Sequence, residues 1–445
     1  MRQRVGRVGD RNRSGRSLLA RNPYLAVLRT PTALPFSSAA FVGRMSMSMY
    51  GLGTVLLIAS LTGRYGTAGM VAAAGSIGYA IFGPVAANLA DRVGQHRVLV
   101  PQVIVFALST ATFISCAELR VPFWLLLVTG AVAGASMPSI GSMVRTRWSA
   151  LIGSDTRRLH TAFALESVND ELIFVVGPAL VTVLATQFRP ASGIGTAALL
   201  CTVGTVLFAI QRRSEPTPRP RPAGARVGAD GAVTASAATG GAGRRPWRPS
   251  VPAPALITLS PAFLLLGAMF STIDLSTVAF ASQQGHRPLA GVILGIYALG
   301  SAVGGLWYGS RQWHAPLGRR FTITAALAVA GVATFWAMPG LLALGAVVLV
   351  AGLAISPTLI AAYAILEGQA PQHRRTEAMA WLSSTVSVGV AAGSAIAGHI
   401  IDAHGARWGF GFAACCGVAA VLICLAGLGR LRTGSLEPRE ASATA

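Results

Sequence analysis

Residues 87–99 read ANLADRVGQHRVL and join two long apolar stretches, residues 68–90 and 98–117. Each stretch has roughly the 20 residues that an α-helix needs to cross a hydrocarbon layer about 30 Å thick. Neither shows the alternation over about ten residues that is typical of a membrane β-barrel strand. The sequence therefore predicts two membrane-spanning helices joined by a short polar loop at one membrane surface.

Similar apolar stretches recur along the whole chain. Of its 445 residues, 53% are hydrophobic and 11% are charged, whereas a soluble domain has about 25% charged residues. In lipid every backbone polar group needs an internal partner, which helices provide. The chain is thus predicted to be an all-α membrane protein with twelve transmembrane helices, near residues 35–61, 68–90, 98–117, 121–144, 162–187, 192–211, 256–281, 287–309, 319–338, 340–364, 377–401 and 408–430.

One long hydrophilic stretch separates the sixth and seventh predicted spans. It contains the runs TPRPRPAGAR and TASAATGGAG, which cannot bury a core and are typical of a disordered linker. The predicted organisation is a cytoplasmic arginine-rich tail, an N-terminal six-helix half, a cytoplasmic linker, a C-terminal six-helix half and a second cytoplasmic tail. These parts correspond to residues 1–33, 34–211, 212–254, 255–431 and 432–445.

The two halves repeat each other at an offset of about 217 residues. Ala133-Gly134 followed by Pro138 in the fourth span corresponds to Ala351-Gly352 followed by Pro357 in the tenth. Two parallel six-helix repeats place a substrate site near the middle of the bilayer, between the halves.

Arginine supplies all 36 basic residues and gives a net charge of +21. Short loops predicted on the side of the N-terminus carry eleven arginines, Arg145 and Arg147 among them, whereas loops on the other side carry five. This bias indicates membrane topology and not a nucleic-acid partner, because positive charge accumulates in cytoplasmic loops. We therefore expect a multi-pass protein of the cell membrane, embedded in the lipid bilayer, with both termini cytoplasmic.

The residues typical of catalytic and metal sites do not form recognisable motifs. The five cysteines lie in or beside apolar spans without a CxxC pair, and the seven histidines lack HExxH spacing. Without lysine the chain has no Walker-type phosphate loop. We expect no cofactor, no metal and no enzymatic activity.

The loop at residues 87–99 resembles the signature loop of the major facilitator superfamily, which runs Gly-x-Leu-Ala-Asp-Arg-x-Gly followed by basic residues. The residues that match are Leu89, Ala90, Asp91, Arg92, Gly94 and Leu99. Gln95-His96 stands where the basic pair belongs, and Arg97 follows one place later. Ala87 stands in place of the first glycine. The lysine-free, alanine- and arginine-rich composition is typical of a GC-rich genome, so the resemblance is to members of an actinobacterial type.

This resemblance implies the major facilitator fold and a conformational latch at the loop. In the latch, Asp91 would meet a helix end or an arginine of the other half when the outside is open. The alternative is a solvated pair of charges in an inner loop. Gly177-Pro178 in the fifth span resembles part of the element typical of antiporters in this superfamily, or marks a local helix kink. The fourth span has Thr129-Gly130 where many exporters carry a coupling arginine.

Five charged residues lie within the predicted spans: Arg44, Glu166, Asp170, Glu171 and Asp274. A charge at the centre of a transmembrane helix costs about 2.5–3.5 kcal/mol on insertion scales, so these side chains must face a partner or a watery cavity. Arg44 and Asp170 lie roughly 14 and 12 Å from the inner face. They can meet if the first and fifth helices adjoin, as the resemblance implies.

At least one acid then has no cation, and such an acid can load and release protons near neutral pH. Our hypothesis is that Arg44 with Glu166, Asp170 or Glu171 forms the coupling or substrate-charge site; the alternative is a structural ion pair. Asp274 is a further candidate, with an outer-interface acid in water as its alternative. The eleventh span lacks these acids.

The function that we predict is secondary active transport by alternating access, as proton-coupled export of a small organic molecule. An importer or uniporter of a small solute remains an alternative, as does a non-transporting membrane sensor with the same fold. We expect the protein to act as a monomer with a small-molecule substrate and protons as its partners.

Overall fold

The computed structural model describes residues 23–218 and 254–429, apart from residues 154, 310, 312, 314, 370–374 and 428. The C-terminal tail and most of the linker, as predicted from the sequence, lie outside the described residues. So do residues 1–22 of the N-terminal tail. Within the described part, residues 23–28 of that tail form the short helix α2 (Pro23–Leu28).

Twelve helices or helix pairs of the described part are long and apolar enough to cross a membrane, which confirms the predicted spans. The first half comprises α3 (Ala33–Thr62), α4 (Tyr65–Val93), α5 (Gln95–Glu118), α6 (Phe123–Ala135), α7 (Ile140–Ile152), α8 (Thr156–Gln187) and α9 (Pro190–Ile210). The second comprises α10 (Pro254–Gln283), α11 (Leu289–Gly309), α12 (Leu317–Thr334), α13 (Leu341–Gly352), α14 (Ile355–Gln369), α15 (Arg375–His404) and α16 (Ala406–Ala426).

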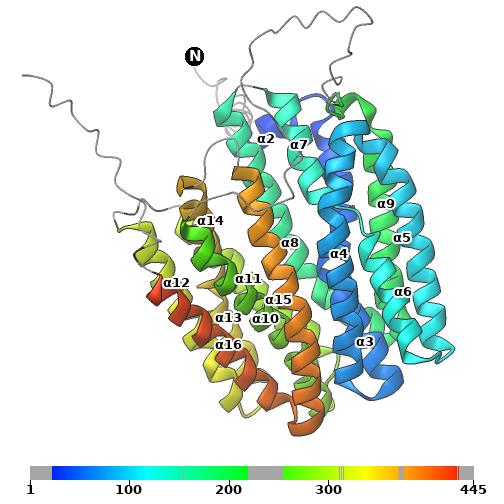
Figure 1. The fold of residues 1–445 in the computed structure, drawn as a ribbon, viewed down its shortest axis with the longest axis vertical. Helices are drawn as coiled ribbons and strands as arrows, with labels where there is room; N and C mark the ends of the chain where they lie inside the picture. Colours follow the sequence, from blue (N-terminus) through cyan, green and yellow to red (C-terminus); the bar gives the residue numbers. More distant parts are fainter. Residues whose placement is uncertain are drawn as a thin grey trace, which may run out of the picture.

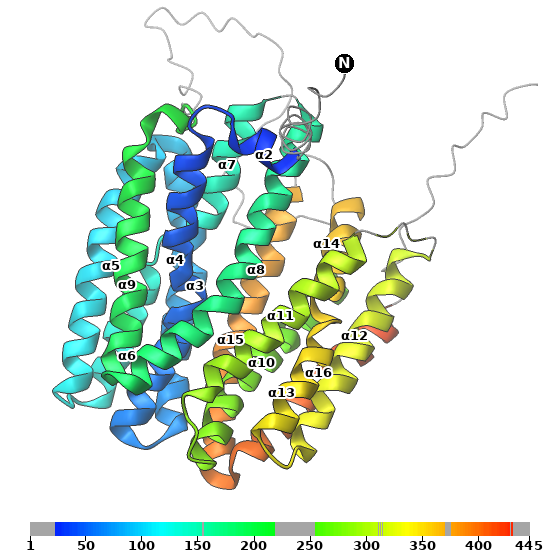
Figure 2. The same ribbon diagram turned by 180° about the vertical axis from the view of Figure 1, so that it is seen from behind.

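The two halves stand side by side as two helical bundles (Figures 1 and 2). We call the end of the bundle that carries α2 the near end, and the opposite end the far end. The halves contact each other mainly through two helix pairs, α4 with α15 and α8 with α11. The middle of the molecule therefore lies between helices of different halves.

The fourth span of each half is broken at the same place. In the first half α6 ends at Ala135 and α7 begins at Ile140; in the second half α13 ends at Gly352 and α14 begins at Ile355. These breaks coincide with the repeated glycine and proline positions, because proline cannot donate to the helical ladder. The internal repeat predicted from the sequence is therefore present in the fold.

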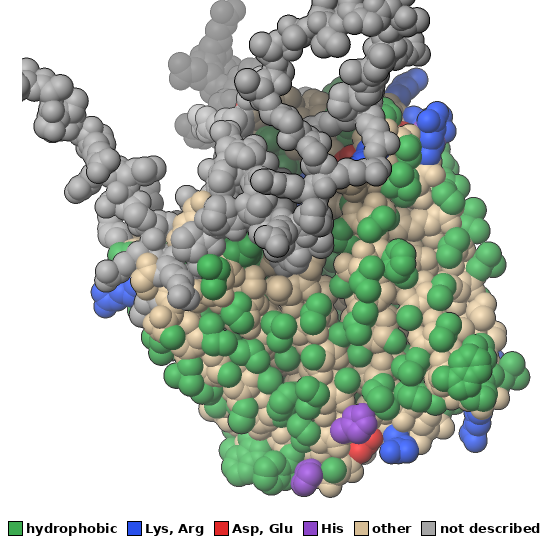
Figure 3. Space-filling model, in the orientation of Figure 1, with side chains coloured by type: hydrophobic (Ala, Val, Ile, Leu, Met, Phe, Trp, Pro, Cys, Tyr) green, Lys and Arg blue, Asp and Glu red, His purple; other side chains and the backbone are tan. Residues whose placement is uncertain are grey.

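The visible surface matches a membrane environment. Hydrophobic side chains cover the middle of the face in Figure 3, and the coloured charged side chains gather toward its two ends. Large apolar side chains such as Leu108, Leu207 and Leu306 are exposed along the helices. Exposed apolar area on this scale is expected where lipid takes the place of water.

The start of the predicted linker is ordered, which corrects the expectation that disorder begins at residue 212. Arg212–Ser214 forms a 3-10 turn, and the Glu215 carboxylate accepts hydrogen bonds from the His96 backbone N–H at 3.1 Å and lies 2.9 Å from its ring Nδ1. Arg147 Nη1 donates to the hydroxyl of Ser214 at 3.0 Å. Side chains of the first half therefore hold the first residues after the sixth span.

Candidate functional site

A four-charge network lies between α3, α7 and α8, and consists of Arg44, Arg145, Glu166 and Asp170. Arg44 donates to the Asp170 carboxylate at 2.6 Å and also pairs with Glu166. Arg145 donates to the second oxygen of Asp170 at 2.8 Å. The structure thus brings Arg44 together with two of the three predicted acids, and its two positive and two negative charges balance.

Glu166 is satisfied on every side. Besides Arg44, its carboxylate accepts hydrogen bonds from the Ser37 hydroxyl at 2.7 Å and from the Trp148 indole N–H at 2.8 Å. The Glu166 and Arg44 side chains have no exposed surface. A buried ion pair is stable only where further hydrogen bonds complete it, and this one has them.

Arg145 is a member of the network that the sequence analysis placed in a loop. Arg145 and Arg147 both belong to α7, and Arg147 is fully buried. The predicted fourth span ended at residue 144 because the arginines lower the local hydropathy. The sequence signal that could have extended the span is Trp148, because a large aromatic residue just after Arg145 and Arg147 is consistent with a helix that continues in the protein interior.

Glu171 lies beside the network but points to the other half. Its carboxylate accepts a hydrogen bond of 2.9 Å from Ser356, the second residue of α14, directly after the helix break. Ser356 in turn shares a hydrogen bond of 2.7 Å with Ser301 on α11. Glu171 is partly buried, and no cation among the described residues pairs with it. It is therefore the predicted acid without a positive partner.

Asp274 lies about 14 Å from the far end of α10 at 1.5 Å per residue. Its side chain is exposed. Tyr297 lies about 12 Å from the far end of α11, a helix that contacts α10, and so at a similar depth.

The residues Gly177 and Pro178 lie where α8 touches two neighbours. A side chain at Gly177 would overlap Ser48 of α3, and the Pro178 carbonyl lies against Gly291 of α11. The Ser48 hydroxyl donates to the Ile173 carbonyl at 2.8 Å. Gly177 therefore permits close packing, and Pro178 lies at the contact between the halves.

The loop with the signature residues lies at the near end. Asp91, Arg92 and Arg97 are exposed, and Leu89 has 47% of its surface exposed. Gly94 is buried with φ of +106°, a backbone conformation that favours glycine. The structure shows no ion pair for Asp91 among the described residues, so the latch predicted for the outward-open state is not formed here.

The far end is closed by contacts between the halves. The Asp402 carboxylate of α15 accepts hydrogen bonds of 2.7 Å each from the backbone N–H groups of Tyr65 and Gly66, the first residues of α4. Gly69, one turn further, lies against the Ser394 carbonyl. An acid of one half thus caps a helix of the other half.

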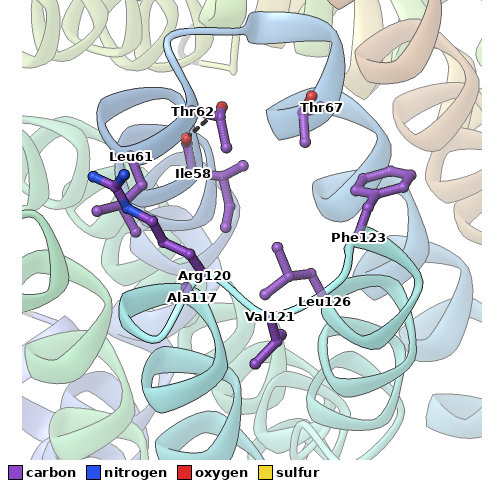
Figure 4. A pocket seen from close by; sticks show the side chains of 9 residues that line it. All are labelled: Ile58, Leu61, Thr62, Thr67, Ala117, Arg120, Val121, Phe123 and Leu126. Carbon is purple, nitrogen blue, oxygen red and sulfur yellow. Dashed lines mark hydrogen bonds between the residues drawn. The ribbon is translucent and has the colours of Figure 1, made fainter.

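A separate pocket opens at the far end within the first half (Figure 4). Its lining includes Ile58, Thr62, Arg120 and Phe123, and its volume is about 190 Å³. The helices that form it, α3, α4, α5 and α6, belong to one half. The pocket therefore does not lie between the halves.

The family follows from the sequence as a whole. The model of the Major Facilitator Superfamily matches residues 36–314 and 287–444. The chain belongs to the major facilitator superfamily. It is therefore a multi-pass membrane transporter of a small-molecule substrate, and not an enzyme.

Solved structures of this superfamily share its fold. A peptide transporter of the POT family, described as auto-inhibited, has a TM-score of 0.65 and 17% identity over 89% of this chain and 96% of its own. A bacterial homologue of the iron transporter ferroportin, in an inward-facing state, has a TM-score of 0.64 and 12% identity over 89% and 99%. A nucleoside transporter has 0.62 and 14% over 91% and 100%. The sequence matches none of the curated proteins.

Proposed function

We propose that this major facilitator transporter exports a small organic molecule from the cell in exchange for protons, with Glu171 as the proton-binding group. The observation that carries the proposal is the hydrogen bond between Glu171 and Ser356. This bond joins a carboxylate of the first half, which has no cation as partner among the described residues, to the helix break of the second half.

The four-charge network has a different role in this proposal. Arg44 and Arg145 form ion pairs with Glu166 and Asp170, so the charges of the two acids are compensated within the network. These residues therefore hold α3, α7 and α8 together as a rigid body. Proton exchange falls to the acid outside the network, Glu171.

The contact between Glu171 and Ser356 opposes movement of the two halves when neither proton nor substrate is bound. A deprotonated Glu171 accepts the Ser356 hydroxyl and sits at the first turn of α14, where the helix dipole favours negative charge. Neutralising the carboxylate weakens both interactions and frees the halves to move. An exchanger must change conformation only when a proton or the substrate is bound. The contact between Glu171 and Ser356 would prevent the change when neither is bound.

The arginine distribution indicates which end of the transporter faces the cytoplasm. With the near end in the cytoplasm of a cell-membrane protein, the far end that Asp402 holds to α4 would face the outside, which supports an inward-open state. The signature loop with Asp91 would then form its latch after the near end closes. We propose that one chain completes this cycle as a monomer.

A transport assay tests the proposal in two steps. First, cells that lack their own efflux pumps express the protein and are screened for resistance and reduced accumulation of organic compounds. Second, the purified protein receives the compound found, and proton release into weak buffer is measured. Wild-type protein is expected to release protons and the Glu171→Gln variant to release none, while the variant still carries the compound down its gradient.

Glu118→Gln is the matched control, because Glu118 is an exposed carboxylate at the far end of α5. It should release protons like the wild type. Equal proton release from Glu171→Gln and the wild type would refute the role of Glu171. An absence of proton release from all three proteins would refute proton exchange itself.

A further inference from the structure

We infer that Asp274 and Tyr297 form a subsite for an organic cation, so that the substrate is a positively charged molecule with an apolar body. This inference rests on the proposed transport path between the halves, and it adds the chemical class of the substrate. Two observations carry it: an exposed acid about 14 Å from the far end of α10, and a buried phenol at a similar depth on α11 whose hydroxyl has no partner among the described residues.

Asp274 is accessible where its neighbours are not. Ile273 and Leu275 on either side are buried in the core, yet the Asp274 side chain is exposed about 14 Å from the far end of α10. No cation among the described residues forms an ion pair with it. Arg287, the first arginine after it in the chain, donates instead to the Leu56 carbonyl at 3.3 Å.

Tyr297 supplies the second and independent observation. Its side chain is 9% exposed, and its hydroxyl is buried without a hydrogen-bond partner among the described residues. The ring packs edge-on against Phe335 with centroids 6.2 Å apart, so its position is fixed. Buried hydroxyls nearly always have a partner. A phenol without one, at a similar depth to Asp274 on a contacting helix, is available to a ligand that Asp274 binds.

The charge balance at this depth gives the sign of the ligand. The four-charge network is neutral on its own, so Glu171 and Asp274 remain as two negative charges without a cation among the described residues. A positively charged ligand would compensate this charge, whereas an anion would be repelled. A cation can also replace the proton as the species that neutralises the site.

The donor set favours an organic cation over a metal ion. Calcium and magnesium need about six or more oxygen ligands, and the described residues contain no group of three His, Cys, Asp or Glu side chains that could hold a metal. Asp274 offers one carboxylate, and Phe270, one turn before it, adds a partly buried aromatic ring. A carboxylate next to aromatic rings suits an ammonium or phosphonium group.

A pair of ions with the same shape and opposite charge tests the inference directly. Tetraphenylphosphonium and tetraphenylborate are titrated against the purified full-length protein in detergent, with binding followed by thermal shift and equilibrium dialysis. We expect the wild type to bind the phosphonium and the Asp274→Asn variant to bind it at least about tenfold more weakly, since a desolvated charge pair is lost.

Two further variants keep the test decisive. Asp274→Glu retains the charge, and its affinity for tetraphenylphosphonium should stay within about threefold of the wild-type affinity. Asp155→Asn is the matched control, because it makes the same change at the N-cap of α8, where asparagine also caps a helix. It should bind like the wild type.

Equal binding of tetraphenylborate, unchanged binding by Asp274→Asn, or failure of the wild type to bind tetraphenylphosphonium, ethidium and benzalkonium would overturn the inference. Proton release is recorded on the same samples. Binding of the cation without proton release would refute the proposed exchange and leave the cation subsite standing. Proton release that depends on Glu171 but is triggered by an uncharged ligand would support the proposed exchange and refute the cation subsite.

Discussion

Removing the Asp402 carboxylate should open the far end of the transporter. This side chain belongs to α15, and it is the acceptor for the first two backbone N–H groups of α4 in the other half. The first N–H groups of a helix have no partner within the helix. Asp402 therefore acts as a helix cap supplied by the opposite half, and the cap is lost when the halves separate.

The geometry sets the size of the effect. A hydrogen bond to a charged group contributes about 1.5–3 kcal/mol, and loss of a helix cap costs about 1 kcal/mol. Because Asp402 is exposed and screened by water, the two bonds of 2.7 Å together contribute about 2 kcal/mol. Asp402→Ala should therefore shift the ratio of outward-open to inward-open states by about 30-fold. Asp402→Asn keeps one acceptor and should shift it by about fivefold.

Spin labels at the far end can measure this ratio. Leu119 and Leu342 belong to different halves and are 77% and 93% exposed, so labels there disturb no packing. In a background without the native cysteines, double electron–electron resonance should show a second, longer distance whose population grows from wild type to Asp402→Asn to Asp402→Ala. Asp155→Asn at the near end should leave the distribution unchanged.

The population of the longer distance should rise in the order wild type, Asp402→Asn, Asp402→Ala, and two results would contradict this. An unchanged distance distribution in Asp402→Ala would show that the cap does not hold the far end closed. A longer distance of equal population in both variants would show that charge alone matters and that the count of hydrogen bonds does not. Thermal melting of the same samples distinguishes opening from general loss of structure.

Three further outcomes are expected. Glu166→Gln should lower the stability in thermal melts by about 3 kcal/mol, the low end for breaking a buried ion pair, because a second acid stays beside the arginine. Burial raises the pKa of Glu215, but hydrogen bonds from its histidine partner outweigh it and hold that pKa below 4.5. Its stabilisation is then present above pH 4.5 and lost as the pH falls through the lower folded value, so Glu215→Gln should melt with a weaker pH dependence between about pH 3 and 5. Gly69→Ala places a methyl group against the Ser394 carbonyl and should lengthen the far-end label distance, whereas Gly51→Ala, with nothing within 4 Å, should not.

Much of the fold could be predicted from the sequence because lipid imposes strict rules. Spans of about 20 apolar residues follow from the thickness of the bilayer, and the breaks after Ala135 and Gly352 follow from the repeated prolines. The ordered start of the linker could not be predicted in this way. Glu215 and Ser214 lie in a polar stretch whose composition indicates disorder, and only the positions of His96 and Arg147 reveal their partners.

The candidate site was predictable in its residues but not in its pairings. Arg44 and the acids of α8 stand out because charge in a membrane span requires a partner. Which acid remains without a cation depends on Arg145, whose span continues further than its hydropathy indicates. The partner of Glu171 is 185 residues away, in the other half. Contacts between the halves depend on the conformational state, which local sequence patterns do not encode.

The contacts made by Asp402 and Glu171 between the halves share one design. Asp402 of the second half meets the first turn of α4, and Glu171 of the first half meets the first turn of α14. Each places a carboxylate of one half at the N-terminus of a helix in the other, where the helix dipole and free backbone donors favour negative charge. Neutralising either acid therefore weakens a contact between the halves. In the proposed exchange, a proton on Glu171 acts in this way and frees the halves to move.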